Sequence, residues 1–563
     1  MVVFADAEQE KRVDFLKKRE EESLAQMLSH KYGVEYVDLS LVAINTDALR
    51  LVPEAEARET EAAVFGMVGK RLSVAARAPE NPKVKALLAG LVERGFTPNV
   101  FMVSQESLKR AFSRYADLSY ATESHAGVFS LTPAAIEELL AAIKTTDDIK
   151  KLIGEAVSMQ RTYRVTRILE VVLAGGLALS ASDIHFEPQE ASVRLRYRLD
   201  GILVDVLDLD QETYRLALSR LKLLSGMKLN ITNLAQDGRF SIKVRGEEIE
   251  IRASILPDNY AETMVMRLLN PASIAVQFDE LGIAPKLRER IEKEIAKPNG
   301  MVLTTGPTGA GKTTTLYAFL RKVNVPGTKI ITIEDPVEYH LQGIVQTQVD
   351  KKNYTFALAL REALRQDPDV IMVGEIRDGE VAETAINAAL TGHLVFSTLH
   401  TNDAAGSFPR LIDLGVSEKV LSSAINAAMA QRLVRKLCPA CRTSRPASAP
   451  EQEIVGRHLA SIVDRSLVPA SANVNQKEFT VYDAKPEGCP ECHGRGYRGR
   501  VGIFECIFMD AKIEEVLRTK PSGREVLAAA RPQGFPTMQE DGALKVLLGI
   551  TSLEELSRVV DLG

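Results

Sequence analysis

Apolar residues recur along this chain with two different periods, and the changes of period separate its domains. Residues 15–30 carry apolar side chains at helical spacing, and short strand-like and helical pieces follow to about residue 115. This pattern predicts a small mixed α/β module. Residues 118–146 are rich in Ser, Thr and Gly, contain a helix start at Thr132 and Pro133, and predict a flexible connection. We therefore assign residues 1–145 to an N-terminal regulatory or docking domain and its linker.

The pattern changes after residue 149. A long helix is expected over residues 161–179, and two alternating strands over 193–199 and 201–207, joined by a tight turn at Asp200 and Gly201. A second hairpin is expected over residues 239–254. Helices and antiparallel hairpins in this order predict an α+β domain over residues 146–275.

From residue 276 onward, short apolar runs alternate with helix-like segments. The runs at 300–305, 330–333, 370–373 and 394–398 have the uniformly apolar character of strands covered on both faces. This alternation predicts a doubly wound α/β domain over residues 276–563. Residues 443–476 are rich in Ser, Pro, Ala and Asn and are expected to form an insertion in it.

A phosphate-binding loop directly follows the first of these runs. Its sequence is G-x-x-x-x-G-K-[ST], with a strand-like run before it and a helix-like stretch after it. Glycines allow consecutive N–H groups to surround phosphates, Lys312 would reach the β- and γ-phosphates, and Thr313 would help to hold Mg²⁺. The residues expected to bind ATP are Gly306, Pro307, Thr308, Gly309, Ala310, Gly311, Lys312, Thr313 and Thr314.

Hydrolysis also needs acidic groups at the same edge of the sheet. Glu375 ends the 370–373 run, and we expect it to act as the general base. Glu334, Asp335 and Glu338 follow the 330–333 run, where carboxylates can position Mg²⁺ or water, with Asp335 the expected magnesium ligand. Two histidines, His393 and His400, bracket the 394–398 run and are candidates for sensing or coupling.

Four of the five cysteines form two C-x-x-C pairs, the ligand spacing of a structural zinc site. The alternative is two separate redox or unligated pairs, which a reducing compartment disfavours. We expect a zinc-binding subdomain over residues 436–502, with a closed coordination sphere that leaves no position for catalysis. The expected ligands are Cys438, Cys441, Cys489 and Cys492, whereas Cys506 is expected in the core.

Composition narrows the functional classes. The 563 residues suggest about three or four compact units. The 70 basic and 75 acidic residues give a net charge of −5, so no global positive field attracts nucleic acid. The charged start and the lack of a long apolar run predict a cytoplasmic protein, for which docking on a membrane partner stays open. A nucleic-acid motor remains an alternative because of basic residues near the cysteines: Arg432, Arg435, Lys436, Arg442, Arg495, Arg498 and Arg500.

The other alternative is a scaffold that binds nucleotide without hydrolysing it. The intact Lys312 and Glu375 argue against this class.

These motifs together closely resemble the secretion ATPases of the type II secretion and type IV pilus superfamily. The order and spacing of the phosphate loop, residues 333–338, residues 367–378 and residues 392–402 match the Walker A, Asp box, Walker B and His box of these motors. The resemblance extends over about residues 150–563 and includes the paired cysteines. Residues 32–39 are similar, less specifically, to the amino-terminal domain of the same motors.

The resemblance implies a homo-hexamer of a PAS-like and a RecA-like domain that uses ATP, Mg²⁺ and Zn²⁺ and moves an inner-membrane platform protein. It also implies arginine fingers, at positions that here carry Arg252, Arg267, Arg361 and Arg365. The paired cysteines and the N-terminal extension favour pilus extension or type II secretion motors over retraction motors. The nature of the cargo, the symmetry of the hexamer and the direction of its cycle stay open.

Some N-terminal domains of this family bind cyclic di-GMP through an arginine-leucine-glycine motif. We do not find that motif in this sequence, so regulation by this ligand is not expected.

Overall fold

The computed structural model describes residues 21–117, 128–129, 133–158, 161–270, 276–350, 353–468 and 479–563, except positions 41, 43, 45, 50 and 69. The chain forms two units, Met1–Glu123 and Ser124–Gly563. None of the described helices is both long enough and apolar enough to cross a lipid bilayer.

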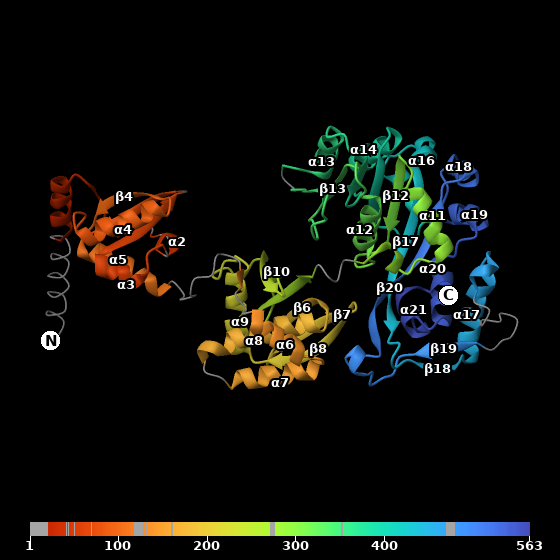
Figure 1. Cartoon of the computed structure of the whole chain (residues 1–563), viewed down its shortest axis with the longest axis horizontal. Helices are drawn as coiled ribbons and strands as arrows, with labels where there is room; N and C mark the ends of the chain where they lie inside the picture. Colours follow the sequence, from red (N-terminus) through yellow and green to blue (C-terminus); the bar gives the residue numbers. More distant parts are fainter. Residues whose placement is uncertain are drawn as a thin grey trace, which may run out of the picture. The chain divides into compact units, whose positions relative to one another are not determined.

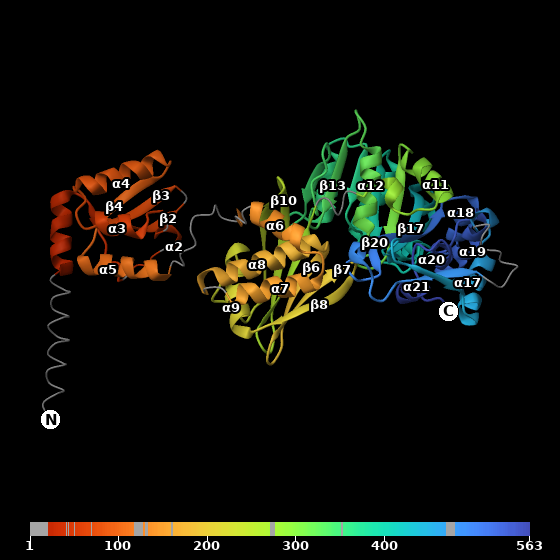
Figure 2. The same cartoon turned by 60° about the horizontal axis from the view of Figure 1, so that its bottom comes forward.

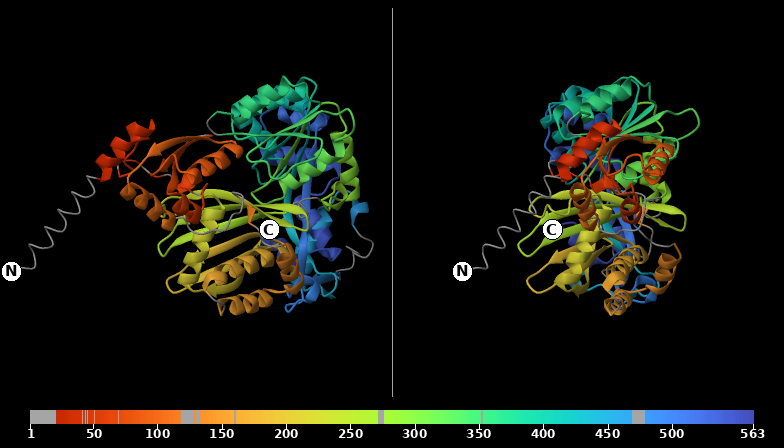
Figure 3. Two further views of the ribbon diagram at one scale, coloured as in Figure 1. Left: turned by 60° about the vertical axis from the view of Figure 1, so that its left-hand side comes forward. Right: turned by 90° about the vertical axis from the view of Figure 1, so that its left-hand side faces the viewer.

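The first unit is a four-stranded sheet with helices, as the sequence predicts (Figure 3). The strand order is β1-β4-β3-β2, with β3 parallel to β4 and antiparallel to β2. Apolar residues such as Val64, Val74 and Leu91 form its own core. The elements are β1 (Glu35–Tyr36), α2 (Thr46–Leu49), α3 (Glu54–Thr60), β2 (Ala62–Val68), β3 (Arg71–Ala76), α4 (Pro82–Glu93), β4 (Thr97–Met102), α5 (Gln105–Ser113) and η1 (Arg114–Asp117).

The second unit begins with a seven-stranded, mainly antiparallel sheet of order β5-β9-β10-β11-β6-β7-β8, whose core includes side chains of four helices. Figure 2 shows helices beside the strands of this sheet. Asp200 and Gly201 make the predicted hairpin turn with φ angles of 49° and 88°. The elements are β5 (Val128–Phe129), α6 (Pro133–Ala142), α7 (Thr146–Val157), α8 (Arg161–Ala178), β6 (Ala181–Pro188), β7 (Val193–Leu199), β8 (Ile202–Leu209), α9 (Gln211–Leu224), β9 (Gln236–Val244), β10 (Glu247–Pro257) and β11 (Glu262–Leu269).

The boundary expected after residue 145 lies too late in the chain. Helix α6 falls within the segment predicted as a flexible connection, yet Ile136 and Leu139 on one of its faces are buried in the core of this sheet. Residues 118–127 of that segment lie outside the described residues. The apolar face of a ten-residue helix therefore outweighed the local Ser, Thr and Gly content.

The remainder of the second unit is built on the predicted doubly wound sheet, of order β14-β13-β15-β16-β12-β17-β20 (Figure 1). All pairs are parallel except β17 with β20. Two cores cover its faces, because Met301 and Leu303 of β12 belong to one and Val302 to the other. The elements up to β17 are η2 (Phe278–Glu280), α11 (Pro285–Ile295), β12 (Gly300–Thr305), α12 (Lys312–Val323), β13 (Ile330–Glu334), β14 (Val345–Gln348), α13 (Phe356–Leu364), β15 (Val370–Val373), α14 (Gly379–Leu390), β16 (Leu394–Leu399), α15 (Ser407–Asp413), α16 (Glu418–Ala424) and β17 (Ile425–Leu437).

The predicted insertion separates the two last strands of this sheet. It begins with β18 and contains helix α17, whereas β19, which pairs with β18, lies just beyond the expected end of the insertion at residue 476. Four α-helices follow β20. Cys506 of β20 is buried in the core, as expected. The elements are β18 (Thr443–Pro446), α17 (Ala449–Ser461), η3 (Arg465–Leu467), β19 (Thr480–Asp483), η4 (Pro490–Cys492), β20 (Tyr497–Phe508), α18 (Ala511–Leu517), α19 (Gly523–Ala530), η5 (Arg531–Gln533), α20 (Met538–Leu547) and α21 (Leu553–Val559).

Candidate functional site

The loop between β12 and α12 has the backbone shape of a phosphate-binding loop. Gly306, Gly309 and Gly311 have φ angles of 148°, 79° and 87°, which residues other than glycine rarely adopt. A Cβ atom would lie 2.7 Å from the carbonyl oxygen of Gln431 at Gly306, and 3.0 Å from the Gln431 side-chain nitrogen at Gly311. The loop and the start of α12 can therefore direct backbone N–H groups toward an anion.

Lys312 is the first residue of α12 and is 8% exposed. Its ammonium group donates to the carbonyl oxygens of Gly306 at 2.5 Å and Pro307 at 3.2 Å. Burial lowers the pKa of Lys312, and the nearby Glu375 carboxylate opposes that shift. Thr313 follows in the first turn of the helix. The cation is thus held by loop carbonyls at the place where phosphates would be bound.

Glu375 lies just beyond the carboxyl end of β15, at the same sheet edge as the phosphate loop. Its carboxylate forms an ion pair with Arg377 and lies 3.4 Å from Nε2 of His400. The backbone is fixed as well, because Thr398 Oγ1 donates to the carbonyl oxygen of Gly374 at 2.8 Å. Sequence reasoning missed Arg377, although it stands only two residues after the predicted base.

The acidic group after β13 divides into buried and accessible members. Glu334 is buried and accepts hydrogen bonds from Thr332 Oγ1 at 2.5 Å, Gln346 Nε2 at 3.1 Å and the hydroxyl of Tyr317. Burial raises the pKa of Glu334, and these hydrogen bonds oppose the shift. Asp335 follows it in the chain and lies within electrostatic range of Arg377, so it belongs to the same edge as Glu375.

The two predicted histidines lie at opposite ends of β16. His400 follows the strand and faces Glu375. His393 precedes it, its ring Nδ1 lies 3.0 Å from the carbonyl oxygen of Ala388, and its own carbonyl accepts from Gly300 N at the start of β12. A six-residue strand puts about 20 Å between the two positions. His393 therefore lies at the end of β16 away from the phosphate loop, because parallel strands present only their carboxyl ends to the loop, and this geometry gives no support to the sensing or coupling role expected of it.

Arg252 and Arg267 lie directly opposite each other on β10 and β11. Arg252 donates to Glu250 at 3.0 Å and to the carbonyl oxygen of Val337 at 2.6 Å, and it lies 3.7 Å from Glu338. Arg267 donates to Asp183 at 3.1 Å across the β11–β6 pair. The predicted Arg252 thus contacts the loop after β13 that carries the acidic residues. The side chain of Arg267 is 59% exposed.

Arg361 and Arg365 lie in and at the end of α13 on the surface of the nucleotide domain. Arg361 pairs with Glu380 of α14 at 2.7 Å, and Arg365 pairs with Glu362 at 2.6 Å. Both side chains are at least half exposed. These exposed ion pairs contribute little to stability and can exchange partners at low cost.

The four predicted zinc ligands converge. Their sulfur atoms lie within 4.8 Å of one another, with Sγ–Sγ distances of 3.7 Å for Cys438–Cys489, 3.8 Å for Cys441–Cys492 and 3.7 Å for Cys489–Cys492. A tetrahedron with Zn–S bonds of about 2.3 Å has edges of about 3.8 Å. Backbone N–H groups of Cys489 and Gly496 also donate to Cys492 Sγ. The donor set therefore fits a closed zinc site.

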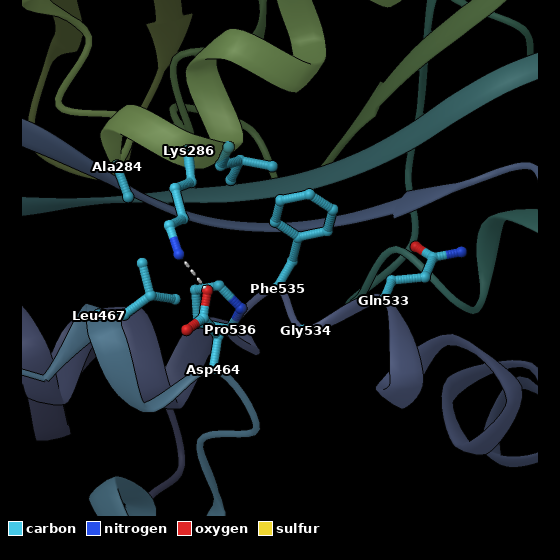
Figure 4. A pocket seen from close by; sticks show the side chains of 9 residues that line it. Ala284, Lys286, Asp464, Leu467, Gln533, Gly534, Phe535 and Pro536 are labelled. Carbon is cyan, nitrogen blue, oxygen red and sulfur yellow. Dashed lines mark hydrogen bonds and ion pairs between the residues drawn. The ribbon is translucent and has the colours of Figure 1, made fainter.

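A cavity of about 200 Å³ lies between α11, the segment at Asp464 and the chain from Gln533 to Pro536 (Figure 4). Lys286 and Asp464 form a 2.7 Å ion pair at its wall. Its lining contains no residue of the phosphate loop. It is therefore separate from the site described above.

Comparison with known proteins agrees with this geometry. Residues 159–558 match the family model described as type II/IV secretion system protein, and residues 32–122 match the MshEN domain. The type II secretion system protein E of Pseudomonas aeruginosa is 43% identical over 396 residues, which are 70% of this chain and 75% of that protein. The type IV pilus assembly ATPase PilB of Myxococcus xanthus is 35% identical over 543 residues, 95% of this chain and 91% of that protein.

Among solved structures, the pilus retraction motor PilT with bound ADP aligns with 69% of this chain and 95% of its own, at 27% identity and a TM-score of 0.46. The family model alone spans well over half of the chain, and it includes the phosphate loop, Glu375 and the four cysteines. The resemblance inferred from the motifs is confirmed. The chain belongs to the type II/IV secretion system protein family, and it is a P-loop ATPase of that family.

Proposed function

We propose that this chain is the hexameric ATPase motor that powers type IV pilus assembly through an inner-membrane platform protein. The observation that carries the proposal is the share of this chain that aligns with each relative. The pilus assembly ATPase of Myxococcus xanthus aligns with 95% of this chain, including the first unit, whereas the Pseudomonas aeruginosa type II secretion protein aligns with 70%. We take the shared N-terminal unit as a sign of a shared docking partner.

A second candidate, the ATPase of a type II secretion system, is favoured by a different observation. The Pseudomonas aeruginosa type II secretion protein is 43% identical over the 396 residues that it shares with this chain. The two candidates share the motor core and differ in the exported fibre.

The chain's residues fit ATP and Mg²⁺ because three glycines give the loop the backbone shape of an anion site and Lys312 places a cation beside it. Residues 306–314 would hold the phosphates, with Lys312 on the terminal ones, and Thr313 and Asp335 would hold Mg²⁺. Bound there, the nucleotide and metal supply the reactive phosphoryl group and neutralise its charge.

Glu375 orients a water molecule and accepts its proton in this proposal. Arg377 forms an ion pair with this carboxylate and His400 lies 3.4 Å from it, so both side chains hold it in place. Both oxygens of Glu334 accept hydrogen bonds from buried side chains, so in this proposal it positions the loop that bears Asp335 and Glu338 and does not bind the metal itself.

Arg252, Arg267, Arg361 and Arg365 act as fingers when domains or neighbouring subunits close on the nucleotide. Their ion pairs are partly or largely exposed, so an anionic phosphate can replace the carboxylate partner. Positive charge that arrives only on closure couples closure to hydrolysis. The resulting motion would be passed to the platform protein at the cytoplasmic face of the inner membrane, with no direct contact to nucleic acid and a structural zinc ion in the insertion.

Deletion of the gene in its own host tests the choice between the two fibres. We expect loss of surface pili with protein secretion intact, and restoration by the wild-type chain but not by Glu375→Gln. Loss of secretion with normal pili would instead assign the chain to type II secretion.

A further inference from the structure

Two consecutive residues of β17, Gln431 and Arg432, lie against the phosphate loop but belong to none of the motifs described above. Strand β17 is the neighbour of β12 on the side away from β16. Its pairing with β12 ends at Thr305 opposite Ala430. Beyond that point β12 becomes the loop while β17 continues, so the next two residues of β17 lie beside the loop.

Gln431 contacts the loop at three of its residues. It is 1% exposed, and its Nε2 donates to the carbonyl oxygen of Ala310 at 2.6 Å. Its backbone oxygen and its Nε2 are the atoms that a Cβ at Gly306 or Gly311 would meet. The side-chain oxygen has no hydrogen-bond partner among the described residues, although it is buried. The amide is therefore held by donation to Ala310, which a carboxylate could not provide.

Arg432 joins the loop region to the segment after β16. Its Nη1 donates to the carbonyl oxygen of Gln431 at 3.0 Å, and its Nη2 donates to that of Asn402 at 2.9 Å. Within the described part of the chain, no carboxylate lies within ion-pair distance of its guanidinium. Burial lowers the pKa of Arg432, with Asp403 and Glu505 opposing. This cation is thus used to hold two backbone carbonyls.

The segment held by Arg432 carries His400, which faces Glu375. It has two other anchors: Thr305 Oγ1 accepts from Thr401 N at 2.8 Å, and Glu505 accepts from Ala404 N at 2.9 Å. The three anchors come from the adjacent strands β12, β17 and β20. The β12 anchor, Thr305, directly precedes the phosphate loop in the chain, and the β17 anchor packs beside the loop, because a Cβ atom at Gly306 would lie 3.1 Å from Arg432 Nη1.

We propose that Gln431 and Arg432 are positioning residues for ATP hydrolysis. Gln431 sets the shape of the phosphate loop, and Arg432 sets the position of the His400 segment, and hence of Glu375, relative to that loop. The inference rests on the proposed role of Glu375. It requires the two residues to act on different quantities: Gln431 on nucleotide affinity, and Arg432 on turnover.

The test uses the full-length chain and measures the Kd for a non-hydrolysable ATP analogue with Mg²⁺, the kcat for ATP, and the unfolding temperature. Gln431→Glu should weaken analogue binding by about tenfold or more, because it removes the donor to Ala310 and places an acceptor near the phosphates. Arg432→Gln should lower kcat by about tenfold to a hundredfold with less than about a threefold change in Kd.

Two matched variants keep the test decisive. Arg432→Lys, which retains a cation and donors, should recover part of the kcat lost in Arg432→Gln. Arg498→Gln removes an exposed arginine of β20 and should change none of the three quantities. Equal losses of affinity and turnover, no loss in either variant, or no recovery with Arg432→Lys would overturn the proposal. If Glu375→Gln keeps full turnover, the proposed base is wrong, while the effect of Gln431→Glu on Kd still tests the loop.

Discussion

The two seven-stranded sheets of the second unit carry their charged side chains at different places. In β7 of the first sheet buried and partly exposed residues alternate strictly, whereas every residue of β12 in the second sheet is buried. The first sheet therefore presents charged side chains along its open face. The second can present them only where its strands end.

A row of charges crosses the open face of the first sheet. Arg239, Arg252, Arg267, Asp183 and Arg198 occupy facing positions on five adjacent strands. Like charges directly opposite each other destabilise a sheet, and the single Asp183 accepts from or pairs with two of the four arginines. Such a row is costly in isolation and fits a surface that receives an anion. At the second sheet, by contrast, Lys312 and Glu375 converge at one edge because parallel strands end there together.

We expect the largest effect on ATP turnover from a substitution at the carboxyl ends of the parallel strands. Glu375→Gln should lower the ATP turnover number by about a thousandfold, because it removes a general base, and should leave ATP bound. Lys312→Ala should instead weaken binding. Steady-state hydrolysis and binding of a fluorescent ATP analogue measure both quantities. Equal nucleotide affinity in the two variants would contradict the division of roles.

Loss of the zinc ligands should come next in size. Cys492→Ser, or treatment with a strong chelator, should lower the free energy of unfolding of the C-terminal insertion by at least about 3 kcal/mol, because metal binding is coupled to folding. Metal analysis should give one zinc ion per chain, and nucleotide affinity should change little. A chelated protein with unchanged unfolding would rule out a structural zinc ion.

A buried ion pair beside β17 gives a smaller effect with a defined pH dependence. Burial alone would raise the pKa of Glu555, but hydrogen bonds from Arg558 and Arg435 lower it below its usual value near 4.5. Its contribution to stability is therefore present above pH about 4.5 and is lost as the pH falls through the lowered value. Glu555→Gln should cost about 3 kcal/mol at pH 7 and less at low pH, measured by urea unfolding. A cost that is independent of pH would contradict the ion pair.

The smallest stability effect is expected on the open face of the first sheet. Arg267→Ala removes an exposed pair and a repulsive contact with Arg252, so the unfolding free energy should change by less than about 1 kcal/mol. Turnover of the assembled protein should nevertheless fall by about tenfold or more if the side chain is a finger. Unchanged turnover in the assembled state would make Arg267 a surface residue only.

The sheet that contains β5 to β11 was harder to predict from the sequence than the sheet that contains β12 to β17. The runs at 300–305 and 370–373 match β12 and β15, since uniformly apolar runs between helices leave little choice of structure. The flexible connection predicted before residue 146 contains α6, because its burial depends on the sheet it packs against. The roles of the two histidines could not be separated either, since a strand's direction toward the loop is not a local property.

The sequence by itself determined the phosphate loop, the order of the domains and the spacing of the four cysteines, because each follows from backbone freedom or ligand chemistry over a few residues. Only the tertiary structure decided which side chains meet. In the folded chain His393 lies at the far edge of the sheet, and Arg377 and His400 contact Glu375. Glu334 is buried, and Gln431 packs against a loop 121 positions away in the chain. The physical reason is that these contacts depend on strand order and direction, which no local stretch of residues specifies.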